Sequence, residues 1–238
     1  MAILSPQGPN KGAVEQMFNE IARSYDLINT LLSFGTDSKW RRRLVRMVAE
    51  GGAREILDLA AGTGEVTVRL AEALLESHIT AADLSEGMLG VARRKVERAG
   101  VGERVEVVVA DAEAMPFEDA RFDCATLVFG IRNFSAPVAA LNELARVTRE
   151  GAMVYIMEFG TPRKGLFGWC YRIYQHYVMP FVGGLLSGKW RAYRYLPASI
   201  GSFEQRVDVA KEMAEAGFRE VTTTNLTGGI AKLYIGKR

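Results

Sequence analysis

The sequence predicts an α/β fold whose central sheet has seven strands, mostly parallel, and ends in an antiparallel hairpin. Between about residues 54 and 160, short apolar runs alternate with longer segments in which apolar residues recur every three or four positions. This alternation is typical of βαβ units, in which helices cover both faces of a parallel sheet. Near the C-terminus, Thr227, Gly228 and Gly229 separate two strand-like runs, as in a hairpin.

The strands are placed by their apolar, β-branched runs. In the parallel part these runs are nearly continuous, because both faces of each strand are expected to be covered. The expected parallel strands are Glu55–Ala60, Ile79–Leu84, Val105–Asp111, Phe122–Phe129 and Ala152–Phe159. The expected hairpin pairs Glu220–Leu226 with Ile230–Gly236.

The helices are placed by the spacing of their apolar residues and by the residues at their ends. Ser85 is a suitable N-cap, and Gly100 stands where a C-terminal cap is expected. The helices expected between the strands are Glu65–Leu75, Ser85–Ala99 and Pro137–Thr148. Two more, Val14–Ser24 and Ser38–Glu50, are expected ahead of the sheet.

No internal repeat or low-complexity linker divides the chain, so we expect a single domain over residues 1–238. Its expected parts are a helical cap (1–50), a cofactor-binding core (51–160), a substrate lid (161–203) and a C-terminal helix with the hairpin (204–238).

The composition argues against several classes of protein. Lys and Arg number 30 and Asp and Glu 28, and this net charge of +2 does not suggest a nucleic-acid binder. Cys124 and Cys170 are too few for a disulfide framework, so we expect free thiols. His78 and His176 lie far apart in sequence, and no Cys/His cluster has ligand spacing, so no metal site is expected.

The apolar segments predict a cytoplasmic protein. Residues Met1–Pro9 lack the basic and long apolar segments of a signal peptide. The most apolar stretch, Tyr177–Leu186, contains Pro180 and paired glycines and is too short to span a bilayer. Such a protein can still contact the inner face of the membrane.

A glycine-containing turn, Asp58–Gly64, ends the first expected strand and opens the first helix of the sheet region. Gly62 and Gly64 allow the backbone to approach a ligand closely, because no Cβ stands in the way. In an open α/β sheet this turn lies at the carboxyl edge of the strands, where ligands bind. Asp83 ends the second strand about twenty residues later, where an acid accepts hydrogen bonds from ribose hydroxyls. The pair indicates a cofactor that contains adenosine.

Acidic residues at three strand ends favour S-adenosyl-L-methionine over NAD. A dinucleotide site needs a third glycine where Thr67 stands. Asp58 would repel a pyrophosphate, whereas it suits the cationic amino group of a methionine, directly or through water. Asp111, expected at the end of the third strand, and Ala112 after it would lie beside the adenine. An NAD-dependent oxidoreductase is the alternative.

The chain resembles the ubiquinone/menaquinone biosynthesis C-methyltransferase family from about residue 17 to the C-terminus. The segment Asp58–Gly64 is shared by many class I, Rossmann-like methyltransferases, which also end in an antiparallel hairpin. The segments that carry the resemblance are Phe18–Asp26, Asn29, Leu32–Gly35, Trp40–Arg42, Leu57–Gly64, Phe129–Asn133, Glu158–Phe159 and Tyr193–Ile200.

The resemblance implies methylation of a ring carbon on a polyprenylated hydroquinone, with demethylmenaquinol as the leading substrate. The benzoquinol step of ubiquinone synthesis, or both steps in one enzyme, is the near alternative, and a catalytically silent S-adenosylmethionine-binding protein is another. The family's cofactor contacts map to Thr63, Asp83, Asp111, Ala112 and Val128. Other members of the family often carry Ser at the position of Val128. Two departures are small: Ala61 replaces a usual glycine, and Glu65 a usual Asp.

Candidate catalytic residues follow the fourth strand. A ring carbon becomes nucleophilic when an adjacent or opposite hydroxyl loses its proton. Arg132 cannot act as a free base at neutral pH, so we expect it to stabilise the developing oxyanion. Asn133 is expected to orient a water or the ring hydroxyl, with helix capping by the pair as the alternative. Tyr25 and Asp26 are expected to close the site; packing of the Tyr and helix capping by the Asp is the alternative. His176 could be the base, although a structural role fits it better.

The segment between Phe159 and Phe203 contains no Asp or Glu and holds half of the chain's aromatic residues. Its basic residues are Arg163, Lys164, Arg172, Lys189, Arg191 and Arg194. Basic residues beside aromatic ones suit an interfacial surface on anionic lipid. We expect this segment to be a lid that also contacts a membrane; the alternative is a lid that packs on the core or on a partner in a homodimer.

Overall fold

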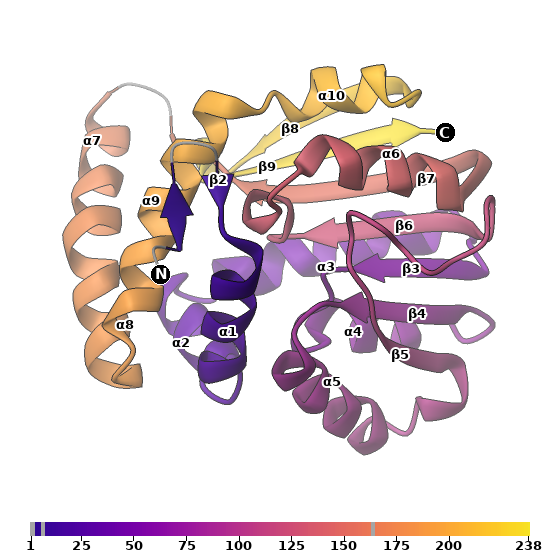
Figure 1. Ribbon diagram of the computed structural model, residues 1–238, viewed down its shortest axis with the longest axis horizontal. Helices are drawn as coiled ribbons and strands as arrows, with labels where there is room; N and C mark the ends of the chain where they lie inside the picture. The colour runs from indigo at the N-terminus through magenta and orange to yellow at the C-terminus, as the bar shows by residue number, and fades with distance from the viewer. Residues whose placement is uncertain (1–2, 6–7, 163–164) are drawn as a thin grey trace.

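The computed structural model describes residues 3–5, 8–162 and 165–238. The described residues leave out positions 1, 2, 6 and 7 of the N-terminal segment. They also leave out Arg163 and Lys164 of the acid-free segment. A seven-stranded sheet with the order β5-β4-β3-β6-β7-β9-β8 forms the centre (Figure 1). The strands are β3 (Glu55–Leu59), β4 (His78–Asp83), β5 (Val105–Val109), β6 (Phe122–Val128), β7 (Thr148–Phe159), β8 (Arg219–Leu226) and β9 (Ala231–Lys237).

Strands β3 to β7 are parallel, and β9 runs antiparallel to both β7 and β8. This confirms the predicted fold class, including the C-terminal hairpin, whose turn is the short helix η4 (Thr227–Gly229). The expected strand Val105–Asp111 is shorter in the structure: β5 ends at Val109, and Asp111 lies in a turn that makes one bridge to Ala114.

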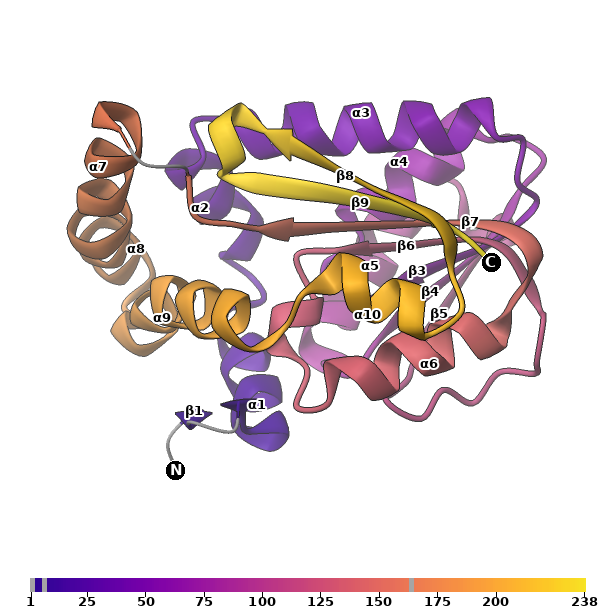
Figure 2. The ribbon, with the colours of Figure 1, turned by 90° about the horizontal axis from the view of Figure 1, so that it is seen from above.

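Helices cover both faces of the sheet (Figure 2). Apolar residues of α3 and α4 pack with one set of strand side chains, and those of α6 and α10 with the other set. Because neighbouring residues of a strand point to opposite faces, Ile56 belongs to the first core and Leu57 to the second. The helices of this region are α3 (Thr36–Glu50), α4 (Glu65–Ala73), α5 (Glu86–Arg98), α6 (Pro137–Val147) and α10 (Val209–Glu215), with the short helices η1 (Gly102–Arg104) and η2 (Ile131–Asn133).

Helix ends follow the local sequence signals. The side chain of Ser85 accepts a hydrogen bond from the backbone N–H of Met88, which caps α5 as expected. Gly100 follows α5 with a φ of +67°, a conformation that a glycine adopts readily. Ahead of the sheet, however, the structure has one more helix than expected. The elements there are β1 (Leu4–Ser5), β2 (Gly8–Pro9), α1 (Lys11–Ile21) and α2 (Tyr25–Leu32).

A second group of helices stands beyond the carboxyl edge of the parallel strands. It joins α1 and α2 to α7 (Leu166–Ile173), a π-helix (Tyr174–Val178), α8 (Met179–Ser187) and α9 (Trp190–Arg206) (Figures 1 and 2). Apolar residues from both segments share one small core, which includes Ile28, Met179 and Tyr193. The N-terminal helices and the segment after β7 are therefore one structural unit over the strand ends. Within the described residues, no helix has both the length and the apolar content that crossing a bilayer requires.

The loops that follow β3 and β6 come unusually close together. A Cβ placed on Gly130 would lie 2.5 Å from the Cβ of Ala60, much nearer than two carbon atoms can approach. Gly130 is thus needed for the close approach of two loops that carry candidate site residues.

We expect Gly130→Ala to lower the free energy of unfolding by about 1–3 kcal/mol, the usual cost of overpacking. Gly90→Ala is the matched control, because Gly90 lies inside α5 with open space around its Cα. That change should raise stability by roughly 0.5–1 kcal/mol. Urea unfolding followed by circular dichroism measures both, and equal stability of Gly130→Ala and the parent chain would contradict the prediction.

Candidate active site

Two cavities adjoin at the carboxyl edge of the sheet. The strand-end cavity, about 120 Å³, is lined by the loops after β3 to β6, including Asp58, Gly62, Asp83, Asp111 and Val128. The helix-lined cavity, about 310 Å³, lies among α1 to α3, α7 and α9 and is mostly apolar. Four residues line both cavities and so mark their junction: Phe18, Tyr25, Arg41 and Phe129.

The glycine turn presents its backbone to the strand-end cavity. Gly62 has a φ of +57°, and a Cβ there would meet nothing within 4 Å, so the space beside it is open. Gly64 has a φ of +76°, and its Cβ would lie 3.0 Å from the Cβ of Ala92 on α5. One glycine therefore leaves room for a ligand, and the other permits close packing of α4 against α5.

Asp83 is fixed by the turn that it faces. Its carboxylate accepts hydrogen bonds from the backbone N–H of Gly62 at 2.9 Å and of Ser85 at 2.8 Å. Burial raises the pKa of Asp83, although these backbone donors counteract the rise. A carboxylate has about four acceptor positions, so these backbone donors leave acceptor capacity for a ribose hydroxyl.

Asp58 is buried in the same cavity, with only 1% of its surface exposed. Its two oxygens accept hydrogen bonds from the hydroxyls of Thr67 at 2.6 Å and Thr126 at 2.8 Å. Loss of hydration raises the pKa of Asp58 to about 6, against the opposing effect of the two hydroxyls. A cationic group bound nearby would stabilise the charged form of Asp58.

Asp111 and Ala112 line the third part of the strand-end cavity. Lys11, at the start of α1, binds the carboxylate of Asp111 at 2.7 Å and that of Glu113 at 2.5 Å. Burial alone would raise the pKa of Asp111, but the hydrogen bond from Lys11 brings it below the usual value. Sequence reasoning did not identify Lys11, which is 100 residues away from its partner.

Helix α1 closes over the strand-end cavity. Lys11, Val14 and Phe18 all line it. Its volume of about 120 Å³ is well below the roughly 300–1,000 Å³ of most small-molecule sites. Its acidic groups match the cationic amino group, the ribose and the adenine amino group of S-adenosylmethionine, so the residues fit this cofactor.

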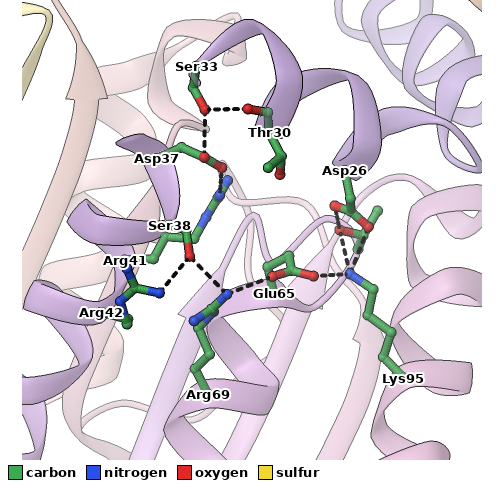
Figure 3. Close-up of polar contacts among 11 residues, drawn as sticks. Asp26, Thr30, Ser33, Asp37, Ser38, Arg41, Arg42, Glu65, Arg69 and Lys95 are labelled. Atoms are coloured by element: carbon green, nitrogen blue, oxygen red, sulfur yellow. Dashed lines mark hydrogen bonds and ion pairs between the residues drawn. The ribbon is translucent and has the colours of Figure 1, made fainter. Parts of the chain in front are cut away.

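Asp26 ties α2 to the glycine turn (Figure 3). Its carboxylate accepts hydrogen bonds from the hydroxyl of Thr63 at 2.6 Å and from Lys95 at 2.7 Å. Lys95 also forms an ion pair with Glu65 at 2.5 Å. Burial alone would raise the pKa of Glu65, but the hydrogen bond and the charge of Lys95 bring it below the usual value. Asp26 is not among the residues that line the two cavities. Its contacts with Thr63 and Lys95 hold α2 against the glycine turn and α5.

Stacked aromatic rings and two arginines form the wall of the helix-lined cavity. The rings of Phe129 and Phe159 stack with their centroids 4.1 Å apart. The guanidinium of Arg41 lies 5.5 Å from the centre of the Phe129 ring, and that of Arg132 lies 5.2 Å from the centre of the Phe159 ring. Such cation–π contacts hold both cations beside the cavity.

Arg132 is 3% exposed and Glu158 1% exposed, and they form an ion pair at 2.8 Å. Glu158 also accepts a hydrogen bond from the backbone N–H of Arg132, and the guanidinium donates to the carbonyl of Phe129. Loss of hydration lowers the pKa of Arg132, but the charge of Glu158 more than compensates, so Arg132 stays cationic. Its Nε is buried without a hydrogen-bond partner in the structure. Arg132 thus carries a positive charge on the wall of the helix-lined cavity, as its expected role requires.

Asn133 lies on the other side of this wall. It lines the strand-end cavity, and its side-chain oxygen accepts a hydrogen bond from the hydroxyl of Tyr195 at 3.0 Å. Tyr195 lines the helix-lined cavity, and burial raises its pKa to about 12. The side chains of Asn133 and Arg132 both donate to the carbonyl of Phe129, so the two residues stay close together although they line different cavities. Tyr25 lines both cavities, whereas His176 is exposed and lines neither.

Asp37 is a buried carboxylate on the wall of the helix-lined cavity that sequence reasoning missed (Figure 3). It accepts hydrogen bonds from the hydroxyl of Ser33 at 2.6 Å and from the guanidinium of Arg41, one helical turn along α3. In sequence the pair looks like an ordinary surface ion pair with i,i+4 spacing. In the structure Asp37 holds the guanidinium of Arg41, which lies over the ring of Phe129.

Comparison with known sequences agrees with this geometry. The profile of the ubiE/COQ5 methyltransferase family matches residues 7–238. The chain is 46% identical to demethylmenaquinone methyltransferase of Thermus thermophilus, over 93% of this chain and 100% of that protein. It is 43% identical to the enzyme of the same name from Clavibacter sepedonicus (94% and 90% covered). It is 40% identical to ubiquinone/menaquinone biosynthesis C-methyltransferase UbiE of Geobacter sulfurreducens (94% and 88% covered).

Solved structures share the fold at low identity. A SAM-dependent methyltransferase from Aquifex aeolicus is 20% identical with a TM-score of 0.54, and the match covers 81% of this chain and 88% of that one. The [4+2]-cyclase SpnF is 17% identical with a TM-score of 0.62, and the match covers 97% of both chains. These similarities show the fold alone, since a cyclase and a methyltransferase both have it.

The raised pKa of Asp58 predicts how cofactor affinity depends on pH. Below its pKa of about 6, Asp58 is protonated and loses its attraction for a cationic amino group. Each pH unit below that value reduces the ionised fraction about tenfold. We therefore expect the Kd for S-adenosylmethionine to increase steadily between pH 7 and pH 5, as measured by calorimetric titration.

Asp58→Asn should weaken binding at pH 7.5 and show a smaller pH dependence, because its amide does not titrate. The control is Glu76→Gln, which removes an exposed carboxylate whose partner is the exposed Arg54. If Asp58→Asn and the parent chain had the same slope of affinity against pH, another group would be responsible.

Proposed function

Because the chain belongs to the ubiE/COQ5 methyltransferase family, we propose that it transfers the methyl group of S-adenosylmethionine to a ring carbon of a polyprenylated hydroquinone, most simply demethylmenaquinol. The observation that carries this proposal is the pair of adjoining cavities, one acidic and one aromatic, which meet at Tyr25 and Phe129. The ubiquinone precursor is the second candidate, because the relative from Geobacter sulfurreducens is named for both quinones. The family assignment favours S-adenosylmethionine over NAD.

The strand-end cavity would hold the cofactor. Asp83 would accept hydrogen bonds from the ribose hydroxyls, and Asp58 would bind the amino cation. The adenine would lie beside Asp111 and Ala112, and it would take the place of Lys11 at the carboxylate of Asp111. The walls would be formed by Gly62, Thr63, Gly64 and Val128. When bound, S-adenosylmethionine supplies a methyl group on a positively charged sulfur, so that the leaving group is already activated.

The helix-lined cavity would hold the quinol ring. Its aromatic walls suit a flat apolar ring and exclude water from it. Arg132 would stabilise the negative charge that develops on the ring oxygen, because a fixed cation acts strongly in a water-poor site. Tyr25, at the junction, would orient the ring. We assign Asn133 to holding Tyr195 against the ring, since its amide oxygen faces that hydroxyl.

Positioning of the two reactants should contribute more to the rate acceleration than proton transfer does. A general base typically gives about 10²–10⁴-fold acceleration, whereas fixed placement of two reactants can supply roughly 7–11 kcal/mol. The chain can provide this placement because Phe129 is held by its stack on Phe159, and Phe159 in turn lies under Arg132.

Residues 161–203 would form the lid over the ring. Phe167, Tyr171, Tyr193 and Tyr195 of this segment line the helix-lined cavity. A quinol with a long isoprenoid tail resides in the bilayer, so the protein would work as a peripheral protein at the cytoplasmic face of the membrane. Association of two copies through the same helices, as a homodimer, is the competing proposal.

The direct test of function is methyl transfer from radiolabelled S-adenosylmethionine to reduced demethylmenaquinone, with mass analysis of the product. We expect one methyl group to be added to a ring carbon, and the benzoquinol precursor to serve as a comparison substrate. Binding of S-adenosylmethionine without transfer to either quinol would contradict the proposal.

The role of Arg132 can be separated from its contribution to folding. Arg132→Lys keeps a positive charge beside Glu158 but loses the planar set of donors. We expect kcat to fall by about 10²-fold, the scale of losing one oxyanion donor, with the Kd for S-adenosylmethionine nearly unchanged.

The control for this variant is Arg121→Lys. Arg121 also lies over aromatic rings, those of Phe117 and Phe122, but away from both cavities. Equal losses in turnover and in cofactor affinity would show that Arg132 belongs to the cofactor site or to the scaffold.

A further inference from the structure

Exposed apolar side chains are concentrated at one end of the molecule. Among the described residues, sixteen large hydrophobic side chains are exposed, and thirteen of them lie in two segments, residues 27–34 and 166–190. These segments are adjacent in space, because α2 packs on α8 and the hydroxyl of Tyr174 donates to the carbonyl of Leu32 at 2.6 Å. Figures 1 and 2 show α7 and α8 at this end, with α2 next to them.

We call this surface the apolar face. It is defined by Leu27, Leu31, Phe34, Leu166, Phe167, Trp169, Ile173, Tyr177, Val178, Phe181, Leu185, Leu186 and Trp190. Several of these side chains are largely exposed, with Leu27 at 76%, Leu166 at 78% and Phe34 at 80%. A concentration of exposed apolar side chains of this kind marks a site of interaction. The contribution of α2 to it could not be recognised from the sequence.

The helix-lined cavity opens on the apolar face. Phe34, Phe167 and Cys170 line the cavity and are also exposed, so they stand at its mouth. Phe34 has a φ of +51°, a backbone conformation that is unfavourable for a bulky residue, and its ring lies 5.8 Å from that of Tyr174. Backbone strain at such a position usually accompanies a functional role.

The cavity is too small for a whole polyprenylated quinol. About 310 Å³ is at the lower limit for small-molecule sites and accommodates a ring with the first part of a tail. The remaining isoprenoid chain must leave through the mouth, and it then lies along the apolar face. A long hydrocarbon chain in that position is stable only if another apolar phase covers it.

The charges near the apolar face favour anionic lipid over other partners. Residues 159–203 include no carboxylate side chain. Arg172 and Arg194, on α7 and α9, are both exposed. Arginines beside exposed Trp, Tyr and Leu side chains are the combination that binds the interface of an anionic bilayer.

We propose that the apolar face, formed by α2 together with α7 and α8, docks on an anionic bilayer, and that the quinol passes between the bilayer and the cavity through the mouth at Phe34, Phe167 and Cys170. The docking surface rests on the exposed side chains, and the passage of a quinol rests on the function proposed above. The isoprenoid tail stays in the lipid while the ring reacts.

The test uses the full chain with two changes on the apolar face, Leu27→Gln and Leu185→Gln. Neither residue lines a cavity, and the two lie on different helices, α2 and α8. Sedimentation with phosphatidylglycerol/phosphatidylcholine vesicles measures docking. We expect the parent chain to pellet with the vesicles and the double variant to bind at least about tenfold more weakly, since two exposed leucines no longer enter apolar surroundings. High salt should weaken the binding of the parent chain.

Activity on two substrates separates docking from catalysis. Methyl transfer to a water-dispersed quinol with a short tail should be the same in the parent chain and the double variant. Transfer to a long-tail quinol embedded in vesicles should fall in parallel with vesicle binding. The matched control is Leu75→Gln, because Leu75 is 72% exposed but lies after α4, outside the apolar face.

Three outcomes would overturn the proposal: no vesicle-dependent pelleting of the parent chain, equal pelleting of the double variant, or light scattering that shows a dimer which the double variant converts to a monomer. The last would assign the apolar face to a second copy of the chain. A lack of methyl transfer to the short-tail quinol would count against the proposed function, whereas vesicle binding, measured without any quinol, tests the docking surface by itself.

Discussion

The buried ion pair between Arg132 and Glu158 connects the two halves of the site. Removing two charges from water is costly, and breaking such a pair typically costs about 3–5 kcal/mol, because one charge is then left without a partner. Here the pair joins the turn after β6 to the end of β7. It also places a guanidinium over Phe159, which stacks on Phe129 at the junction of the two cavities. The position of Phe129 at the junction of the two cavities is therefore coupled to this buried ion pair.

Much of the strand-end cavity could be predicted from the sequence because chain order determines it. In a parallel sheet, every strand ends at the same edge, so an acid that ends one strand lies close to an acid that ends the next. Asp58 and Asp83 are placed by this rule, and their strands β3 and β4 are direct neighbours in the sheet. Gly62 was recognisable because a tight turn at that edge favours glycine, and its φ there is +57°. The hairpin followed from its turn residues and from the strands on either side.

The helix-lined cavity could not be predicted in the same way. Its walls come from segments far apart in the chain, and α2 was missed because its eight residues give too short a pattern. Lys11, Asp37 and Lys95 look like ordinary surface charges until the fold brings partners to them. Arg132 and Asn133 lie in one 3-10 helix and both donate to the carbonyl of Phe129, yet Arg132 lines the helix-lined cavity and Asn133 the strand-end cavity. A short local segment therefore serves both cavities.

We propose that cofactor and quinol ring meet where the two cavities join, at Tyr25, Arg41 and Phe129. The decisive experiment is a crystal structure of the chain with S-adenosylhomocysteine and a short-tail quinol. We expect the ribose hydroxyls on Asp83, the sulfur directed towards Phe129, and the ring against Arg132 with its tail pointing to Phe34. A ribose bound by another carboxylate, or a ring outside the helix-lined cavity, would show that the two molecules do not meet there.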